Sequence, residues 1–200
     1  MYKSVALSLL WAAAALAQTP PQTWPVTETN LGAIYDENIT VTPGLWIDPN
    51  DVGDEPVLYP TNDDAYEGKY MVFLIDWMIP DDDVTTSNLY RTLVPGLAVN
   101  TTTRLHWWAG NLTLDCDSGV FVNESAAIAT YSSPRPRDST NHTYALYLFD
   151  QPADYVLPEE AAEGLYTSQT TDDRYNFSMV PVFEAVGSPV AATYFLSNDA

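Results

Sequence analysis

The sequence predicts a mainly β protein, in which two antiparallel sheets pack together and a few short helices are added. Short runs rich in Val, Ile, Tyr, Phe and Trp recur along the chain, bounded by Pro, Gly, Asn and Asp, as β-strands are. Two of these runs are apolar at every position, which is typical of central strands covered on both faces. Helix signals are few and come late. Because no repeat or long linker divides the 200 residues, we expect one domain.

Six strands are expected in chain order. The third and the fifth are the two fully apolar runs, which should lie at the centre of a sheet. The expected strands are Leu31–Tyr35, Val57–Tyr59, Tyr70–Ile75, Leu105–Ala109, Tyr144–Phe149 and Val190–Phe195.

Two helices are expected near the C-terminus. The first covers 158–163, where a proline and acidic residues form the first turn and Gly164 follows. The second follows Asp172 or Asp173, either of which can cap it. Pro181 cannot donate a backbone hydrogen bond, so we expect a kink or two short turns there. The apolar residues of this second helix recur at three-residue spacing: Phe177, Val180, Phe183 and Val186.

The first seventeen residues have the features of a secretory signal peptide. Lys3 precedes an apolar run that ends in small residues at Ala15 and Ala17, the positions that signal peptidase reads. The run is shorter than the ~18 to 20 residues that span a bilayer, and no later segment is long and apolar enough to do so. We therefore expect cleavage near Ala17 and a secreted protein. Residues 18–30 are expected to form an extended leader of a single domain at 18–200.

The charge balance excludes nucleic acid as a partner. Twenty-seven acidic residues oppose seven basic ones, for a net charge of −20, whereas a polyanion requires a basic patch. Loss of Lys3 with the signal peptide would make the net charge −21. Only 17% of the residues are charged, so hydroxyls, amides and sugars are expected to keep the surface soluble.

Glycosylation and cysteine content fit an extracellular chain. Six Asn-X-Ser/Thr triplets occur, and the best candidates for glycosylation lie in polar stretches, at Asn38, Asn100 and Asn123. Cys116 is the only cysteine, so no intramolecular disulfide can form and the hydrophobic core must hold the fold. We expect a monomer.

Conventional catalytic motifs are absent from the sequence: it has no G-x-S-x-G, no phosphate loop, no H-E-x-x-H and no C-x-x-C. The only histidines, His106 and His142, stand at the ends of expected strands, and Asp76 follows the third strand. These three strand ends could converge on one pocket.

Five pieces of sequence, in this order, resemble the phosphatidylethanolamine-binding protein (PEBP) family. They are Asp76-x-x-x-Pro80, His106-x-x-x-x-Asn111, Tyr131-x-x-Pro134-x-Pro136, His142-x-Tyr144 with Asp150-Gln151, and a tail with Arg174-x-Asn176-Phe177, Phe183 and Gly187-Ser188-Pro189-Val190-Ala191. The resemblance covers roughly residues 30–195. It implies two antiparallel sheets and a small pocket for phosphate-type headgroups, lined by Asp76, Pro80, His106, Pro134, Pro136, His142 and Tyr144. Imidazole N–H groups and a phenol could donate to phosphate oxygens, and a carboxylate could orient an imidazole.

The chain departs from the family pattern in ways that bear on the ligand. The family's Asp-Pro-Asp-x-Pro is here Asp76-Trp77-Met78-Ile79-Pro80, and its Arg between His and Tyr is Thr143, which removes a cation. An acidic run at 81–83 follows directly. We therefore expect a preference for zwitterions that carry an ammonium beside the phosphate, with cation–π contact from Trp77, Trp107 or Trp108.

Three functions remain open from the sequence. The leading one is a secreted, non-catalytic protein that needs no cofactor and binds phosphate-containing or zwitterionic phospholipid headgroups. The second is an inhibitor of a serine carboxypeptidase or another protease, because the resemblance extends to such inhibitors. The third is an enzyme that uses Asp76, His106 and His142 as an acid/base set or as metal ligands. It ranks below the others because no activated nucleophile accompanies these residues.

Overall fold

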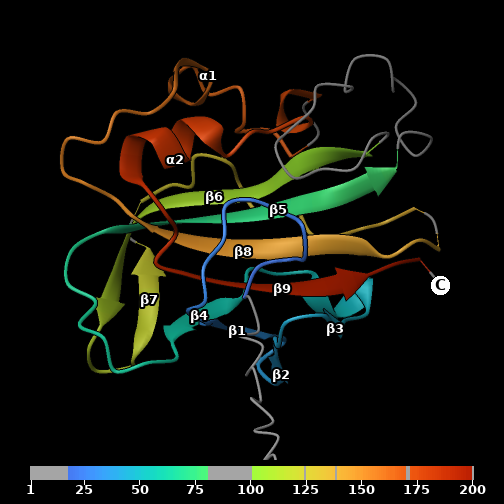
Figure 1. Ribbon diagram of the computed structural model, residues 1–200, viewed down its shortest axis with the longest axis horizontal. Helices are drawn as coiled ribbons and strands as arrows, with labels where there is room; N and C mark the ends of the chain where they lie inside the picture. Colours follow the sequence, from blue (N-terminus) through green and yellow to red (C-terminus); the bar gives the residue numbers. More distant parts are fainter. Residues whose placement is uncertain (1–17, 81–100, 124, 138, 170–171, 200) are drawn as a thin grey trace, which may run out of the picture.

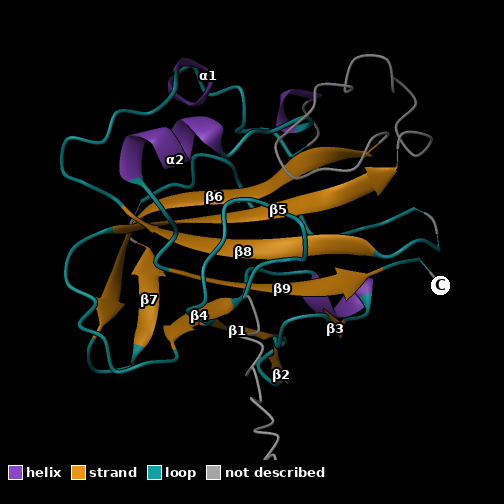
Figure 2. Cartoon of the chain, in the orientation of Figure 1, coloured by secondary structure: helices purple, strands orange, loops and turns teal. Residues whose placement is uncertain are grey.

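The computed structural model describes residues 18–80, 101–123, 125–137, 139–169 and 172–199. Within them, two sheets and two short α-helices form three layers, as Figures 1 and 2 show. The expected signal peptide, the acidic run at 81–83 and the glycosylation candidate Asn100 lie outside the described residues. No helix among the described residues is long and apolar enough to cross a membrane.

The small sheet has the strand order β2-β1-β4, and the large sheet has the order β3-β9-β8-β5-β6-β7. All neighbouring strands are antiparallel except β3 and β9, which are parallel. The strands are β1 (Leu31–Tyr35), β2 (Ile39–Thr40), β3 (Leu45–Trp46), β4 (Val57–Pro60), β5 (Tyr70–Pro80), β6 (Thr101–Asp115), β7 (Val120–Asn123), β8 (His142–Asp150) and β9 (Ala191–Ser197).

All six expected strands are confirmed, and the two fully apolar runs are the central strands β5 and β8. β5, β6 and β8 are longer than expected: β5 continues past Ile75 to Pro80, and β6 and β8 extend beyond the expected apolar runs at both ends. The sequence did not predict β2, β3 or β7. The first two have only two residues each, too few for a periodic pattern.

Each face of the large sheet covers its own hydrophobic core. The core between the two sheets includes Leu31 and Leu58 of the small sheet and Leu74 and Leu146 of the large one. The core on the other face includes residues of the helical layer, among them Val182. This two-sided burial explains why β5 and β8 are apolar at successive positions.

The helical layer contains α1 (Glu159–Ala162) and α2 (Val180–Val186), with the 3₁₀ helix η4 (Asp172–Arg174) between them; a further 3₁₀ helix, η1 (Pro49–Val52), lies between β3 and β4. The first expected helix is confirmed as α1. The second consists of two short pieces, because Pro181 lies in the first turn of α2, where its missing N–H costs no hydrogen bond.

The leader at 18–30 is not extended, contrary to the expectation. Its backbone folds back, so that the Gln18 N–H donates to the Thr27 carbonyl at 3.2 Å. The Trp24 ring packs against Phe183 of α2, with 4.5 Å between centroids. The leader is therefore anchored on the helical layer by apolar contact.

Candidate functional site

Strand register brings the candidate residues to one face of the large sheet. Asp76 of β5 lies opposite Tyr144 of β8 and opposite Arg104 of β6. Residues directly opposite each other in an antiparallel pair share a face, and residues two apart along a strand do too. His142, two residues before Tyr144, therefore joins this group. Tyr144 is part of the core between the sheets, which identifies the face.

A β-bulge in β6 places His106 on the same face. In the pairing of β5 with β6, Leu74 lies opposite Trp107 and the next residue, Ile75, lies opposite Leu105. His106 is therefore the extra residue of β6. A bulge lets two successive residues point to one side of the sheet. His106 and Trp107 can thus both face the core between the sheets, and the His106 ring contacts the Tyr144 ring at 5.3 Å in an edge-on arrangement.

Asp76 and His142 form a buried pair. The Asp76 Oδ2 and the His142 Nδ1 are 2.8 Å apart, and the two residues are 1% and 2% exposed. Since a carboxylate can only accept, Nδ1 carries the proton and the orientation of the ring is fixed. The Tyr144 ring stacks beside His142, 6.2 Å away at an angle of 15°. Tyr144 thus lies in contact with both imidazoles.

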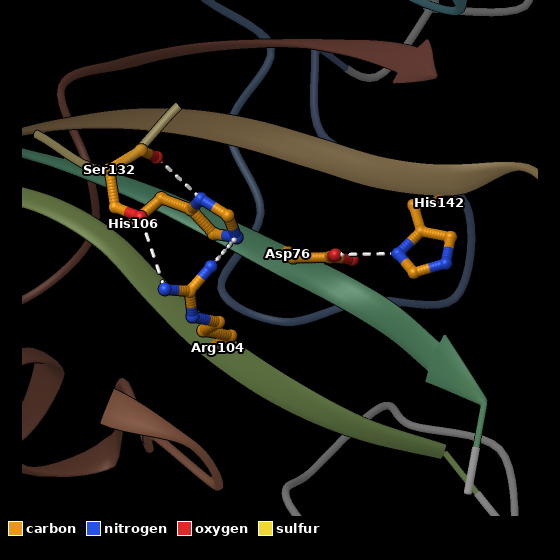
Figure 3. A network of polar contacts seen from close by, with 5 residues as sticks. All are labelled: Asp76, Arg104, His106, Ser132 and His142. Carbon is orange, nitrogen blue, oxygen red and sulfur yellow. Dashed lines mark hydrogen bonds and ion pairs between the residues drawn. The ribbon is translucent and has the colours of Figure 1, made fainter. Parts of the chain in front are cut away.

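His106 makes two polar contacts within the protein. Its Nδ1 lies 2.7 Å from the Ser132 carbonyl, which can only accept, and its Nε2 lies 3.5 Å from the Arg104 Nη1, which can only donate. The ring is therefore the neutral tautomer with the proton on Nδ1. Burial, reinforced by the charge of Arg104, holds the pKa of His106 well below its usual value. Figure 3 shows these contacts beside the Asp76–His142 pair.

Arg104 also lies at this site, although the sequence did not point to it. Its Nη2 donates to the Ser132 Oγ at 3.1 Å and to the Gln169 carbonyl at 2.8 Å. Its guanidinium also lies over the Tyr175 ring, 5.4 Å from the centroid. The alternation of β6 could have revealed it, because Arg104 stands two residues before His106. A guanidinium therefore lies beside Asp76 and His106 although position 143 is a threonine.

The other predicted site residues stand as follows. Pro134 and Pro136 are both buried in the segment that follows Ser132. Pro80 is the last residue of β5, where its backbone pairs with Thr101.

Two expectations about the site are wrong. Asp76 and His106 do not end their strands, because β5 runs on to Pro80 and β6 begins at Thr101. Trp77 and Trp108 lie in the core on the opposite face of the large sheet, so they cannot give cation–π contact here.

A metal does not suit this set of residues. No group of three or more His, Cys, Asp or Glu that could hold an ion occurs in the described part of the chain. His106 turns its Nε2 toward a guanidinium, whose positive charge would repel a cation. The arrangement is better suited to an anionic or hydrogen-bonding ligand.

A cavity of about 200 Å³ occurs elsewhere on the molecule and includes none of the predicted site residues. It lies where β5 begins and β8 ends, away from Asp76. Its lining residues are Asp64, Ala65, Tyr66, Tyr70, Asp150 and Val190.

Comparison with curated proteins gives two fungal relatives. The chain is 29% identical over 209 residues to the phomoidride biosynthesis cluster protein N of Talaromyces stipitatus, covering 97% of this chain and 96% of that protein. It is 30% identical over 93 residues to a protein of the same name from another fungal species, covering 46% of this chain and 42% of that protein. No protein-family model matches the sequence.

Comparison with solved structures identifies the fold. A carboxypeptidase Y inhibitor, solved in complex with its cognate proteinase, matches with a TM-score of 0.57 and 14% identity, over 88% of this chain and 85% of that one. The phosphatidylethanolamine-binding protein of Plasmodium vivax matches with a TM-score of 0.50 and 13% identity, over 90% of this chain and 92% of that one. The architecture and these matches together show that the chain has the fold of the phosphatidylethanolamine-binding proteins.

Proposed function

We propose that this protein binds a small phosphate-containing or zwitterionic headgroup at the site around Asp76, His142 and Tyr144. The observation that carries the proposal is the convergence of chain segments that are far apart in sequence. Asp76, His106 and His142 come from three strands, yet each contacts another member of the site or shares its face. All three are buried, and a few polar groups that converge in mainly apolar surroundings are typical of ligand sites.

Each residue has a separate role in this proposal. Asp76 holds the His142 ring in one orientation, and Tyr144 lies between the two imidazoles. A phenol and a protonated imidazole can donate to the oxygens of a phosphate. His106 acts differently from the expectation, because its Nδ1–H is used by Ser132 and its Nε2 accepts from Arg104. It positions other groups rather than donating to the ligand.

Calorimetric titration with phosphoethanolamine and with inorganic phosphate tests this function. We expect saturable binding at one site, weakened at least about tenfold by His142→Ala, because hydrogen bonds to charged groups contribute roughly 1.5 to 3 kcal/mol. Cys116→Ser is the matched control, since Cys116 is exposed and lies in the turn after β6. Absence of binding to the unmodified protein, or equal binding by His142→Ala, would refute the proposal.

A second candidate function is inhibition of a serine carboxypeptidase or another protease. It is supported by the likeness to the carboxypeptidase Y inhibitor, which bound its proteinase in the solved complex. Titration of carboxypeptidase Y with the purified protein separates this role from headgroup binding. Stoichiometric loss of peptidase activity, with or without phosphoethanolamine, would support it, and undiminished activity at a large molar excess would exclude that target.

A third candidate is acid/base catalysis on a small molecule. The relative that matches over 97% of this chain is named for a biosynthesis cluster, and the site holds a neutral histidine beside a carboxylate–histidine pair. A neutral imidazole and an oriented imidazole can accept and donate protons. Solvent hydrogen exchange into candidate carbonyl compounds, followed by NMR, tests this role. Exchange that is lost in Asp76→Asn and His142→Ala would support catalysis, and exchange equal to the buffer rate would argue against it.

A further inference from the structure

We propose that Arg104 determines the charge specificity of this site, by meeting the negative charge of an oxyanion, either a phosphate or a carboxylate. The inference rests on the proposed binding function and deepens it, because it names the group that recognises the ligand's charge. It also changes the expected ligand. A site with a built-in guanidinium does not need an ammonium on the ligand to offset an acidic surface.

The guanidinium of Arg104 is held in place before any ligand arrives. Its Nη2 is fixed by the Ser132 hydroxyl and the Gln169 carbonyl, and one face of the group lies over Tyr175. Such contacts reduce the conformational entropy that a long side chain loses on binding. Its Cα lies directly opposite that of Asp76 on the neighbouring strand. Arg104 is therefore positioned at the same end of the sheet as the buried pair.

Arg104 retains hydrogen-bonding capacity for a ligand. Its Nε is buried and has no hydrogen-bond partner among the described residues. The contact of its Nη1 with His106 is long, at 3.5 Å. No ion pair joins Arg104 to a carboxylate in the described part of the chain, in a protein with twenty-seven acidic residues. An unneutralised guanidinium with an unused buried donor matches the needs of an oxyanion.

The two histidines are less suited to supply the permanent charge. His106 is neutral, and its Nε2 lone pair faces the guanidinium. Its function in the site is to support Arg104, together with Ser132. His142 is already engaged with Asp76, whose negative charge offsets that of a protonated ring.

Oxyanion binding by a guanidinium depends on pH differently from oxyanion binding by an imidazolium. Arginine stays charged to pH 9 and beyond, whereas an unperturbed imidazolium loses its proton near pH 6.5. The titratable and charged groups around Arg104 and His106 are Asp76 on β5, His142 and Tyr144 on β8, Arg174 in η4 and Tyr175 directly after it. Sulfate does not titrate in this range, so its binding reports on the protein alone. We expect its affinity to change less than threefold between pH 6.5 and 8.5.

Calorimetric titrations of Arg104→Gln, Arg104→Lys and Lys69→Gln with sulfate, phosphoethanolamine and succinate test the inference. Lys69→Gln removes the same charge, but Lys69 precedes the other end of β5, roughly 20 Å from Asp76 at 3.3 Å per residue. We expect Arg104→Gln to weaken binding at least about tenfold, Arg104→Lys to retain part of it, and Lys69→Gln to change it less than twofold. Circular dichroism and urea unfolding identify any variant that fails to fold. If Arg104→Gln fails to fold, the test rests on Arg104→Lys, which keeps the charge.

The outcomes separate this inference from the proposed function. Tighter binding of sulfate and phosphoethanolamine than of succinate would identify a phosphate-type ligand, and the reverse order a carboxylate. Equal binding by Arg104→Gln and Lys69→Gln, or sulfate affinity that falls more than tenfold from pH 6.5 to 8.5, would overturn the role of Arg104 and leave the site itself intact. No binding of any probe to the unmodified protein would overturn both.

Discussion

The carboxylate of Asp76 and the imidazole of His142 are hydrogen-bonded at 2.8 Å across two neighbouring strands, although 66 residues separate them in sequence. Both side chains are buried, so the pair has little access to water. A buried histidine N–H that lost its acceptor would carry the full desolvation cost of that donor. The pair therefore couples the stability of the sheet to the geometry of the site.

Removal of the Asp76 carboxylate should destabilise the fold. We expect Asp76→Ala to lower the free energy of unfolding by about 1 to 3 kcal/mol, because the Nδ1–H of His142 is left without its acceptor. Asp76→Asn retains an oxygen at the same place and should cost less. Urea unfolding measures both values, and a double-mutant cycle with His142→Ala isolates the coupling. Equal costs for the two substitutions, with no coupling, would mean that the hydrogen bond contributes nothing.

The fold was largely predictable because long apolar runs leave few alternatives. The run that became β8 is apolar on both faces, and it is indeed central. A short run of β-type residues between Asn30 and Asp36 marked β1 at its correct limits. What escaped prediction was either very short, as β2 and β3 are, or depended on tertiary contact, as the folded-back leader does. Apolar contact between Trp24 and Phe183 has no signature in local sequence.

The site was predictable only in part, for a related reason. The resemblance pointed to Asp76, His142 and Tyr144, which the register does bring together. The bulge at His106 and the proximity of Arg104 follow from how β6 pairs with β5, and a single sequence does not encode register visibly. Position 143 holds a threonine, yet Arg104 of β6 places a guanidinium opposite Asp76 and beside His106, which the sequence did not reveal.

Neutral His106 makes stability depend on pH in a defined direction. Burial and Arg104 hold its pKa in the folded state well below the unperturbed value near 6.5. Between that lowered pKa and about pH 6.5, the unfolded chain binds a proton that the folded protein does not, so stability is complete above pH 6.5 and declines as the pH falls. The slope from this group is at most ~1.4 kcal/mol per pH unit.

Urea unfolding of the unmodified protein and of His106→Asn, from pH 7.5 to 5, measures this contribution. All other side chains are the same in both proteins, so the difference between the two curves isolates His106. We expect the stability gap between the two proteins to narrow as the pH falls. A gap that is constant over the whole range would show that His106 has the same pKa in the folded and unfolded states.

Arg174 should be the basic residue on which stability depends most. It is fully buried, and its guanidinium donates to the carbonyls of Tyr166 at 2.9 Å, Thr130 at 2.8 Å and His106 at 3.3 Å. Burial, with a smaller effect of Arg104, lowers the pKa of Arg174 to about 10, so it is still charged at pH 7. It thereby connects η4 to the strand that carries His106.

Arg174→Met removes these donors and leaves buried carbonyls unsatisfied, at about 1 to 3 kcal/mol each. We expect the free energy of unfolding, measured with urea, to fall by at least about 3 kcal/mol. Arg174→Lys should restore only part of this loss, because its compact ammonium cannot reach all three carbonyls. Arg137→Met is the control, because Arg137 is exposed. A loss for Arg174→Met that matches this control would mean that the carbonyls are satisfied by other donors.

Secretion and glycosylation give a test that bears on the site itself. If the first seventeen residues are a signal peptide, secreted protein should begin at Gln18, and the exposed Asn38 and Asn123 should carry glycans. Asn141 is also exposed, but it precedes His142 directly, and its Oδ1 accepts from Asn198 at 2.8 Å. A glycan there would crowd the binding site, so we expect Asn141 to be unmodified. Peptide mapping after enzymatic deglycosylation in heavy-oxygen water assigns each position. Full occupancy at Asn141 together with undiminished phosphoethanolamine binding would show that ligands do not enter beside His142.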